Sequence, residues 1–148
     1  MAIFIMLLGI ITLNLNTAKQ KASIETTVDV LLTDLSQQQL KAMVGDTEGR
    51  GTHADYGIHM DTTSYTYFHD SYSVAESTNF VINLPDNFEV TTTFPSNQVI
   101  FEKGSGEISC FVNETCADGT NIITVTDTTN NQQKTIELNR YGIVTEVQ

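Results

Sequence analysis

Residues 1–44 read MAIFIMLLGIITLNLNTAKQKASIETTVDVLLTDLSQQQLKAMV, and this stretch decides the fold. Residues 1–15 carry no charge, and the first charged side chain is that of Lys19. Farther on, apolar side chains recur at the spacing of one helical face, with charged and amide side chains between them. The sequence therefore predicts one helix that is apolar all round at its start and amphipathic afterwards.

The amphipathic part has one apolar face, which we expect to pack on the rest of the chain. Its packing residues are Ile24, Val28, Leu31, Leu32, Leu35 and Met43, with Ala42 on the same face. Between them lie the residues expected to face solvent, which are Lys19, Lys21, Glu25, Asp29, Asp34, Gln37 and Gln38. The helix should end at the glycine-rich stretch GDTEGRG, residues 45–51.

The apolar block at the start of the helix could be a membrane-spanning segment, a secretory signal peptide or part of a buried core helix. As a membrane-spanning segment it is short, because at about 1.5 Å per residue residues 1–15 span about 20 Å, whereas the hydrocarbon core of a bilayer is roughly 30 Å thick. A secretory signal peptide would need a basic segment before the block and a small-residue cleavage site after it, and the TAKQKA that follows fits poorly. A buried core helix would not change from an apolar block to an apolar stripe.

From residue 55 the apolar period changes to two, which predicts an antiparallel β-rich region. Turn residues such as those of DTTS and PDN separate the strands. The expected strands are residues 56–60, 65–68, 80–84, 88–92, 97–102, 122–126, 134–138 and 143–147. We therefore expect a hydrophobic segment over 1–22 and a domain over 23–148, made of the helix 23–45 and a β-rich region 52–148.

Charge and cysteine content limit the classes of function. The net charge is −11, from 18 acidic and 7 basic residues, and such a surface repels the phosphates of DNA. Cys110 and Cys116 close the segment CFVNETC. Their pairing in a disulfide is favoured over part of a metal site because no second cysteine pair or flanking histidine completes one. A disulfide would place the domain outside the cytoplasm.

The potentially reactive side chains suit structural roles better than catalysis, and neither a catalytic residue nor a cofactor is expected. Gly104, Ser105 and Gly106 suit a hairpin turn better than a nucleophile elbow. His53, His59 and His69 could form a metal cluster with nearby aspartates, but solvent-facing histidines are the preferred interpretation. Weak calcium candidates are Asp118 with Asn121, and Asp127 with Asn130, all of which also suit turns.

The order of these segments resembles type IV pilin-like proteins, in particular the GspH/FimT-type minor pilins and pseudopilins. AIFIMLLGII is similar to the apolar run of their first helix, and LLTDLSQQQLKAM is similar to the end of that helix. DYGIHMDTTSYTYF resembles their first β-hairpin, and IITVTD with KTIELNRYGIVTEV resembles their closing hairpin. The resemblance implies an α+β pilin fold, in which a long N-terminal helical spine packs on an antiparallel β-sheet domain. It also implies an upstream segment with the family's processing glycine and glutamate.

The resemblance implies a structural subunit rather than an enzyme. Before assembly it would sit in the inner membrane, and afterwards in a cell-surface filament of a type IV pilus or a type II secretion pseudopilus, near the tip. Its partners would be other pilin or pseudopilin subunits. The membrane and filament-core residues would be Ile3, Phe4, Ile5, Leu7, Leu8, Ile10 and Ile11. Asn14 and Asn16 fit either helix-to-helix contacts or the membrane interface.

Binding of DNA and two other classes of protein were also considered against the sequence pattern. Some GspH/FimT-type proteins bind DNA through basic residues near the C-terminus, but after Lys134 this chain has only Arg140, with Glu137 and Glu146 nearby. No nucleic acid is therefore expected as a partner. The alternative to a pilin is a secreted or membrane-tethered β-sandwich adhesin whose first stretch is an anchor or an export signal. A major pilin is a third interpretation.

Overall fold

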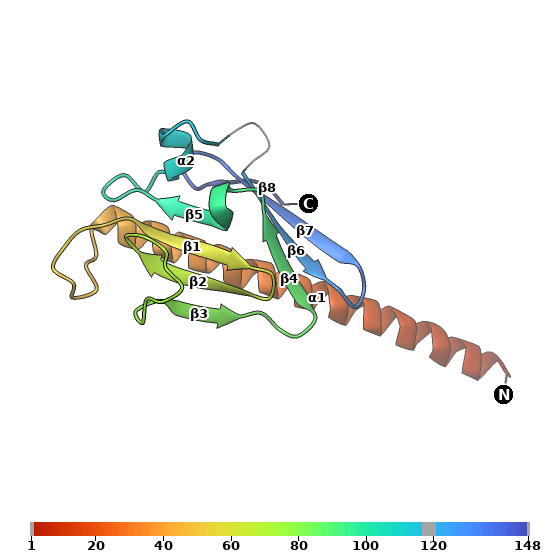
Figure 1. Ribbon diagram of the computed structural model, residues 1–148. Helices are drawn as coiled ribbons and strands as arrows, with labels where there is room; N and C mark the ends of the chain where they lie inside the picture. The colour runs from red at the N-terminus through yellow and green to blue at the C-terminus, as the bar shows by residue number, and fades with distance from the viewer. Residues whose placement is uncertain (1, 117–120, 148) are drawn as a thin grey trace.

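Two antiparallel sheets and a long helix form an α+β fold in the computed structural model (Figure 1). The structure describes the backbone of residues 2–116 and 121–147, and within these ranges it describes side chains from Ser23 onward. The predicted combination of an N-terminal helix with antiparallel sheets is therefore confirmed at the level of fold class. Every expected strand is present, with small shifts at the ends.

Helix α1 covers Ala2–Val44, and a glycine ends it as predicted. Gly45 has a φ of 66°, a left-handed conformation that favours glycine. Its N–H donates to the carbonyl of Ala42 at 3.3 Å, and the N–H of Asp46 donates to the carbonyl of Lys41 at 3.0 Å. This pair of bonds is a Schellman motif, which satisfies carbonyls that the helix end would otherwise leave without partners.

The first sheet has the strand order β3-β2-β1-β5. Its strands are β1 (Tyr56–Asp61), β2 (Ser64–His69), β3 (Phe80–Asn83) and β5 (Gln98–Phe101). Tyr56 pairs with His69 across the β1–β2 hairpin, so the start of β1 lies beside the end of β2. This corner of the sheet lies near the end of α1 (Figure 1).

The second sheet has the strand order β4-β6-β7-β8. Its strands are β4 (Phe88–Thr92), β6 (Ile122–Asp127), β7 (Gln132–Leu138) and β8 (Val144–Val147). The 3-10 helix η1 (Pro95–Asn97) precedes β5, and the short helix α2 (Ser109–Val112) follows it. Phe101 and Ile108 form an isolated bridge between β5 and the segment before α2.

Helix α1 packs against both sheets, contacting β1, β5, β6 and β7. Five residues of its predicted apolar face lie in the core with 4% exposure or less, and these are Ile24, Val28, Leu31, Leu35 and Ala42. Leu32 is partly buried against this core. Facing them are Ile58 of β1, Ile123 of β6 and Ile136 of β7, all fully buried. The predicted helix face is therefore the one that joins the sheets.

Two assignments on the helix were wrong. Met43 is 49% exposed, because it lies near the end of α1, where it covers only the turn at Gly106 rather than a strand. Gln38 was assigned to the solvent face, yet it is 1% exposed. Helix α1 lies across a sheet corner there, so tertiary packing buries a position that the amphipathic pattern treats as polar.

Candidate functional site

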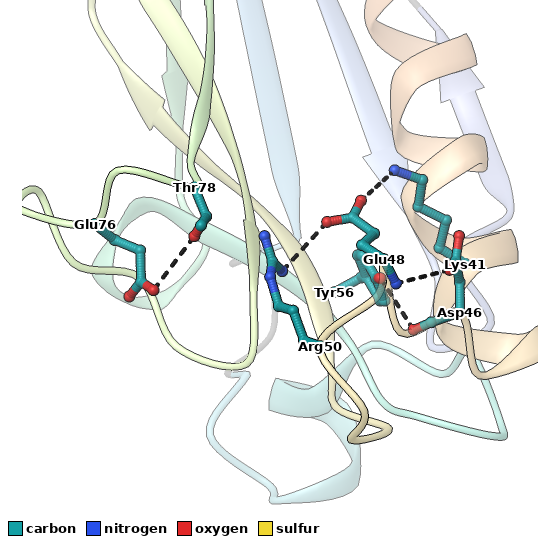
Figure 2. A network of polar contacts seen from close by, with 7 residues as sticks. All are labelled: Lys41, Asp46, Glu48, Arg50, Tyr56, Glu76 and Thr78. Atoms are coloured by element: carbon teal, nitrogen blue, oxygen red, sulfur yellow. Dashed lines mark hydrogen bonds and ion pairs between the residues drawn. The ribbon is translucent and has the colours of Figure 1, made fainter.

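A polar network centred on Glu48 joins the end of α1 to the loop that follows it (Figure 2). Lys41 Nζ lies 2.7 Å from Glu48 Oε1, and Arg50 Nη1 lies 3.2 Å from Glu48 Oε2. The N–H of Glu48 donates to Asp46 Oδ1 at 2.9 Å. Two cations, Lys41 and Arg50, therefore share the carboxylate of Glu48, and the carboxylate of Asp46 lies beside them.

Tyr56 lies beneath this network at the start of β1. Its ring is 5.6 Å from Lys41 Nζ, measured to the ring centroid, and its hydroxyl donates to the carbonyl of Asp46 at 3.0 Å. The pKa of Tyr56 is raised to about 12, mainly by burial and then by the negative charges of Glu48 and Asp46, which Arg50 partly offsets. The tyrosine therefore stays neutral and ties β1 to the loop.

A cavity of about 310 Å³ opens beside the network, between α1 and the first sheet. Its walls come from α1, the loop after it, β1, β2, the segment before β3 and β3 itself. The lining residues are Gln37, Gln38, Lys41, Glu48, Arg50, Tyr56, Tyr67, Phe68, His69, Thr78 and Phe80. This volume is at the lower end of the range of small-molecule sites.

Two residues that line this cavity, Gln38 and His69, each hold a buried Nε2 atom that has no hydrogen-bond partner. Among the side chains that the structure describes, only one other buried polar atom shares this condition, His59 Nδ1. Such atoms are rare in folded proteins because each lost hydrogen bond costs about 1 to 3 kcal/mol. Because two residues with such atoms lie in the wall of this cavity, it is the best candidate for a functional site.

Asp34 and two tyrosines form a second polar contact between α1 and β2. Tyr65 Oη donates to Asp34 Oδ2 at 2.5 Å. Burial raises the pKa of Tyr65 and of Tyr67 well above the usual value, and the carboxylate of Asp34 raises both further. Asp34 was expected to face solvent, so its role as an acceptor for a buried tyrosine is a finding of the structure.

The three histidines occupy separate environments. His53 lies against Gly45, while His69 packs edge-on against Tyr56 with 4.8 Å between ring centroids. His59 stacks on Tyr72 with 3.8 Å between centroids, and its side chain is only 15% exposed. The expectation of a solvent-facing His59 was wrong, because the segment after β2 brings Tyr72 over its ring. Within the described ranges no three His, Cys, Asp or Glu side chains are placed to hold a metal ion together.

The cysteine pair forms the predicted disulfide. Cys110 and Cys116 are bonded, with 5.0 Å between their Cα atoms. Cys110 lies in α2, and the N–H of Cys116 donates to its carbonyl at 3.0 Å. Both side chains are partly buried against the core, and the disulfide closes α2 and the segment after it into one short loop.

The calcium candidates that the structure describes form hydrogen bonds within the fold. Asp118 lies outside the described residues. Asn121 Nδ2 donates to the carbonyl of Leu138 at 2.7 Å, which binds it to β7. Asp127 is 4% exposed, and its Oδ2 accepts a bond from Asn130 Nδ2 at 2.8 Å within the β6–β7 turn. Asn121 and Asp127 therefore have hydrogen-bond partners at a strand end and in a turn.

The Gly104–Gly106 segment forms a turn around Ser105. The N–H of Glu107 donates to Ser105 Oγ at 3.2 Å, and the N–H of Gly106 donates to the carbonyl of Glu102 at 2.8 Å. Gln39 of α1 reaches the same turn, with its Nε2 donating to the carbonyl of Gly106 at 2.9 Å. Ser105 thus acts as a turn residue that positions the turn beside α1.

The predicted membrane and filament-core side chains lie outside the part of the chain whose side chains are described. They are Ile3, Phe4, Ile5, Leu7, Leu8, Ile10 and Ile11. Among the residues that the structure describes, no helix is both long enough and apolar enough to cross a membrane. Their assignment therefore remains a prediction from the sequence.

Sequence reasoning did not find the cavity beside Glu48. Its lining residues are scattered between Gln37 and Phe80, and no motif links them. Comparisons with known proteins do not add to this site, since no protein-family model, no curated protein and no solved structure matches the chain.

Proposed function

We propose that this chain is a structural subunit of a pilin-like filament, namely a minor pilin or pseudopilin of a type IV pilus or a type II secretion pseudopilus. In this proposal residues 1–22 anchor the subunit in the inner membrane and later pack in the filament core. Residues 23–148 form the globular domain outside the membrane. Its partners are other pilin or pseudopilin subunits, and its role is assembly rather than catalysis.

One observation carries the proposal. Helix α1 runs over Ala2–Val44, and its first part extends beyond both sheets (Figure 1), while its core contacts are made by residues from Ile24 onward among the described side chains. A helix that only completed the core would have no reason to continue past the sheets. The sequence of the extending part is the uncharged block of residues 1–15, which suits burial in lipid or against other helices.

The charge of the chain and its disulfide agree with this proposal. The net charge of −11 argues against nucleic acid as a partner. The disulfide between Cys110 and Cys116 suits a domain that works outside the cytoplasm. The resemblance to GspH/FimT-type proteins suggests a place near the filament tip.

Cysteine cross-linking in the natural host tests the proposal. A single cysteine at Ile10 should link the subunit to other pilin-like subunits in filaments sheared from the cells, because this residue would lie in the filament core. A cysteine at Thr129, on the exposed β6–β7 turn, is the matched control and should remain unlinked. Recovery of a secreted domain that begins near Ser23, with no link to filaments, would contradict the proposal and favour the adhesin.

A further inference from the structure

We propose that strand β3 of one copy of this chain pairs edge to edge with strand β8 of a neighbouring copy, so that a sheet of one subunit continues into a sheet of the next. This inference rests on the filament proposal, because it names a contact between globular domains whose helices already hold the subunits together. It requires at least two adjacent copies of the chain in the filament.

Each sheet has one edge that the chain itself covers. At the β5 edge of the first sheet, Phe101 forms a bridge to Ile108. At the β4 edge of the second sheet, the N–H of Val90 donates to the carbonyl of Thr62 at 2.9 Å, in the turn between β1 and β2. Across the ranges that the structure describes, β3 pairs with β2 alone and β8 pairs with β7 alone. The other edge of each sheet is therefore open to a further strand.

Strand β3 presents backbone groups without a strand partner at its outer edge. The N–H of Leu84 donates to the carbonyl of Thr63 at 2.9 Å, so these two residues form an inward-facing pair next to the β2–β3 ladder. Because such pairs alternate along an antiparallel ladder, the N–H and C=O groups of Val81 and Asn83 point away from β2. A strand from another chain matches the spacing of these donors and acceptors.

The sequence of β3 lacks the devices that usually prevent edge pairing. Residues 80–83 read FVIN, with neither a charge nor a proline, whereas edge strands are commonly protected by charged side chains, proline or a bulge. Phe80 and Val81 are both more than half exposed. Strands β3 and β8 each have four residues, and Ile143 and Val147 are exposed at the two ends of β8. The two open edges therefore match in length and in apolar character.

Charge favours pairing of β3 with β8 over pairing of two β3 strands. Two copies of β3, antiparallel about their centres, would bring Asp86 of one copy close to Glu76 of the other, and like charges across strands are destabilising. Antiparallel pairing with β8 instead brings the end of β3 that precedes Asp86 to the start of β8, which follows Arg140. The Arg140 side chain is 49% exposed, and it keeps N–H donors besides the Nη2 that contacts Glu107. In this arrangement Asp86 meets a guanidinium instead of a carboxylate.

The size of the contact fits a neighbouring subunit better than a soluble partner. Pairing of two four-residue strands buries on the order of a few hundred Å² on each copy, below the roughly 800 Å² per partner of a stable complex. Subunits joined through their helices are at high effective concentration, so a weak additional contact can form between them. Strands β3 and β8 lie on opposite sides of the domain (Figure 1), and a contact between two different surfaces continues from copy to copy.

Cross-linking with a short bismaleimide in filaments sheared from the natural host tests the pairing. Two differently tagged copies carry one new cysteine each, Asn83→Cys in β3 and Thr145→Cys in β8, while the native cysteines are bonded to each other. The two tags should become linked. Thr129→Cys on the exposed β6–β7 turn is the matched control for Thr145→Cys, and the link should be lost with it. Equal linking with Thr129→Cys, or between two copies of Asn83→Cys, would overturn the proposal.

A charge placed on the β3 edge should break the contact. Val81→Lys should remove the link between Asn83→Cys and Thr145→Cys, whereas Val74→Lys makes the same change in the exposed loop before β3 and should preserve it. The Ile10→Cys link, measured in parallel, reports whether the filament forms. An Ile10→Cys link without an edge link would overturn this inference alone. Absence of both links would overturn the filament proposal and this inference with it.

Discussion

The hydroxyl of Tyr65 donates a 2.5 Å hydrogen bond to the carboxylate of Asp34, which joins strand β2 to helix α1. Tyr65 is 1% exposed, so its hydroxyl has no access to bulk water as a substitute partner. A hydrogen bond to a charged group is typically worth more than one between neutral groups. This contact therefore fixes where the helix sits on the first sheet.

Tyr65→Phe should lower the free energy of unfolding by about 1 to 2 kcal/mol, because it removes the donor and leaves a partly buried carboxylate without it. Urea titration followed by circular dichroism measures the change. Tyr141→Phe is the matched control, since Tyr141 is 59% exposed and its loss of a hydroxyl should change stability little. Equal stability of the two variants would show that the bond to Asp34 contributes nothing.

Tyr56 should make the protein lose stability at high pH. Its pKa is raised to about 12 in the folded state, mainly by burial, whereas the unfolded chain releases the proton near pH 10. Between these values the folded state holds more protons, so the free energy of unfolding should fall as pH rises from about 10 to about 12. Below this window the contribution is fully present.

Tyr56→Phe removes this titrating group, so its stability should fall less steeply over the same window. The difference in slope should approach about 1.4 kcal/mol per pH unit, the value for one proton. Urea titrations at a series of pH values measure it. Some slope should persist in the variant, because Tyr65 and Tyr67 also have raised pKa values. Parallel curves for the two proteins would exclude Tyr56 as a source of the pH dependence.

The disulfide between Cys110 and Cys116 should stabilise the fold modestly, because it closes a short loop. The chain-entropy treatment predicts about 2 kcal/mol for a loop of this size. The double variant Cys110→Ser/Cys116→Ser should therefore unfold at lower urea concentration than the oxidised protein. Adding a reductant should lower the midpoint of the natural protein but leave that of the double variant unchanged. A midpoint that is insensitive to both changes would contradict a stabilising disulfide.

Local sequence patterns predicted the positions of the helix and the strands, and this agreement has a physical cause. In strand β6 the buried Ile123 and Val125 alternate with residues that point outward. Such a period of two indicates that one face of the sheet is buried. In the same way, the apolar stripe from Ile24 to Leu35 indicates that one face of the helix is buried. These signals lie within single segments, so they can be read without knowing which segments meet.

The cavity could not be predicted because it depends on which segments meet. Gln38 is polar and was assigned to solvent, yet packing across the corner of the first sheet buries it. Arg50 and Phe80 become neighbours of the cavity only through the loops after α1 and after β2. Similarly, His59 loses its exposure only because Tyr72 stacks on it. No spacing in the sequence encodes such contacts between distant segments.

Neighbouring glutamines on α1 should respond to the same substitution in opposite ways. Gln38 is buried, and its Nε2 has no partner, whereas Gln39 Nε2 donates to the carbonyls of Gly106 at 2.9 Å and Tyr141 at 2.6 Å. In the ligand-free protein, Gln38→Leu should raise the free energy of unfolding by about 1 kcal/mol, because it removes an unsatisfied buried group at similar volume.

Gln39→Leu should instead lower the free energy of unfolding by about 1 to 2 kcal/mol, because two carbonyls lose their donor. Urea titration of both variants measures the difference, and their identical chemistry and adjacent positions make each the control for the other. If Gln38→Leu is as destabilising as Gln39→Leu, then Gln38 already has a partner such as a bound water. In that case the amide would be part of a satisfied network rather than an open donor, because only a satisfied amide loses hydrogen bonds when leucine replaces it.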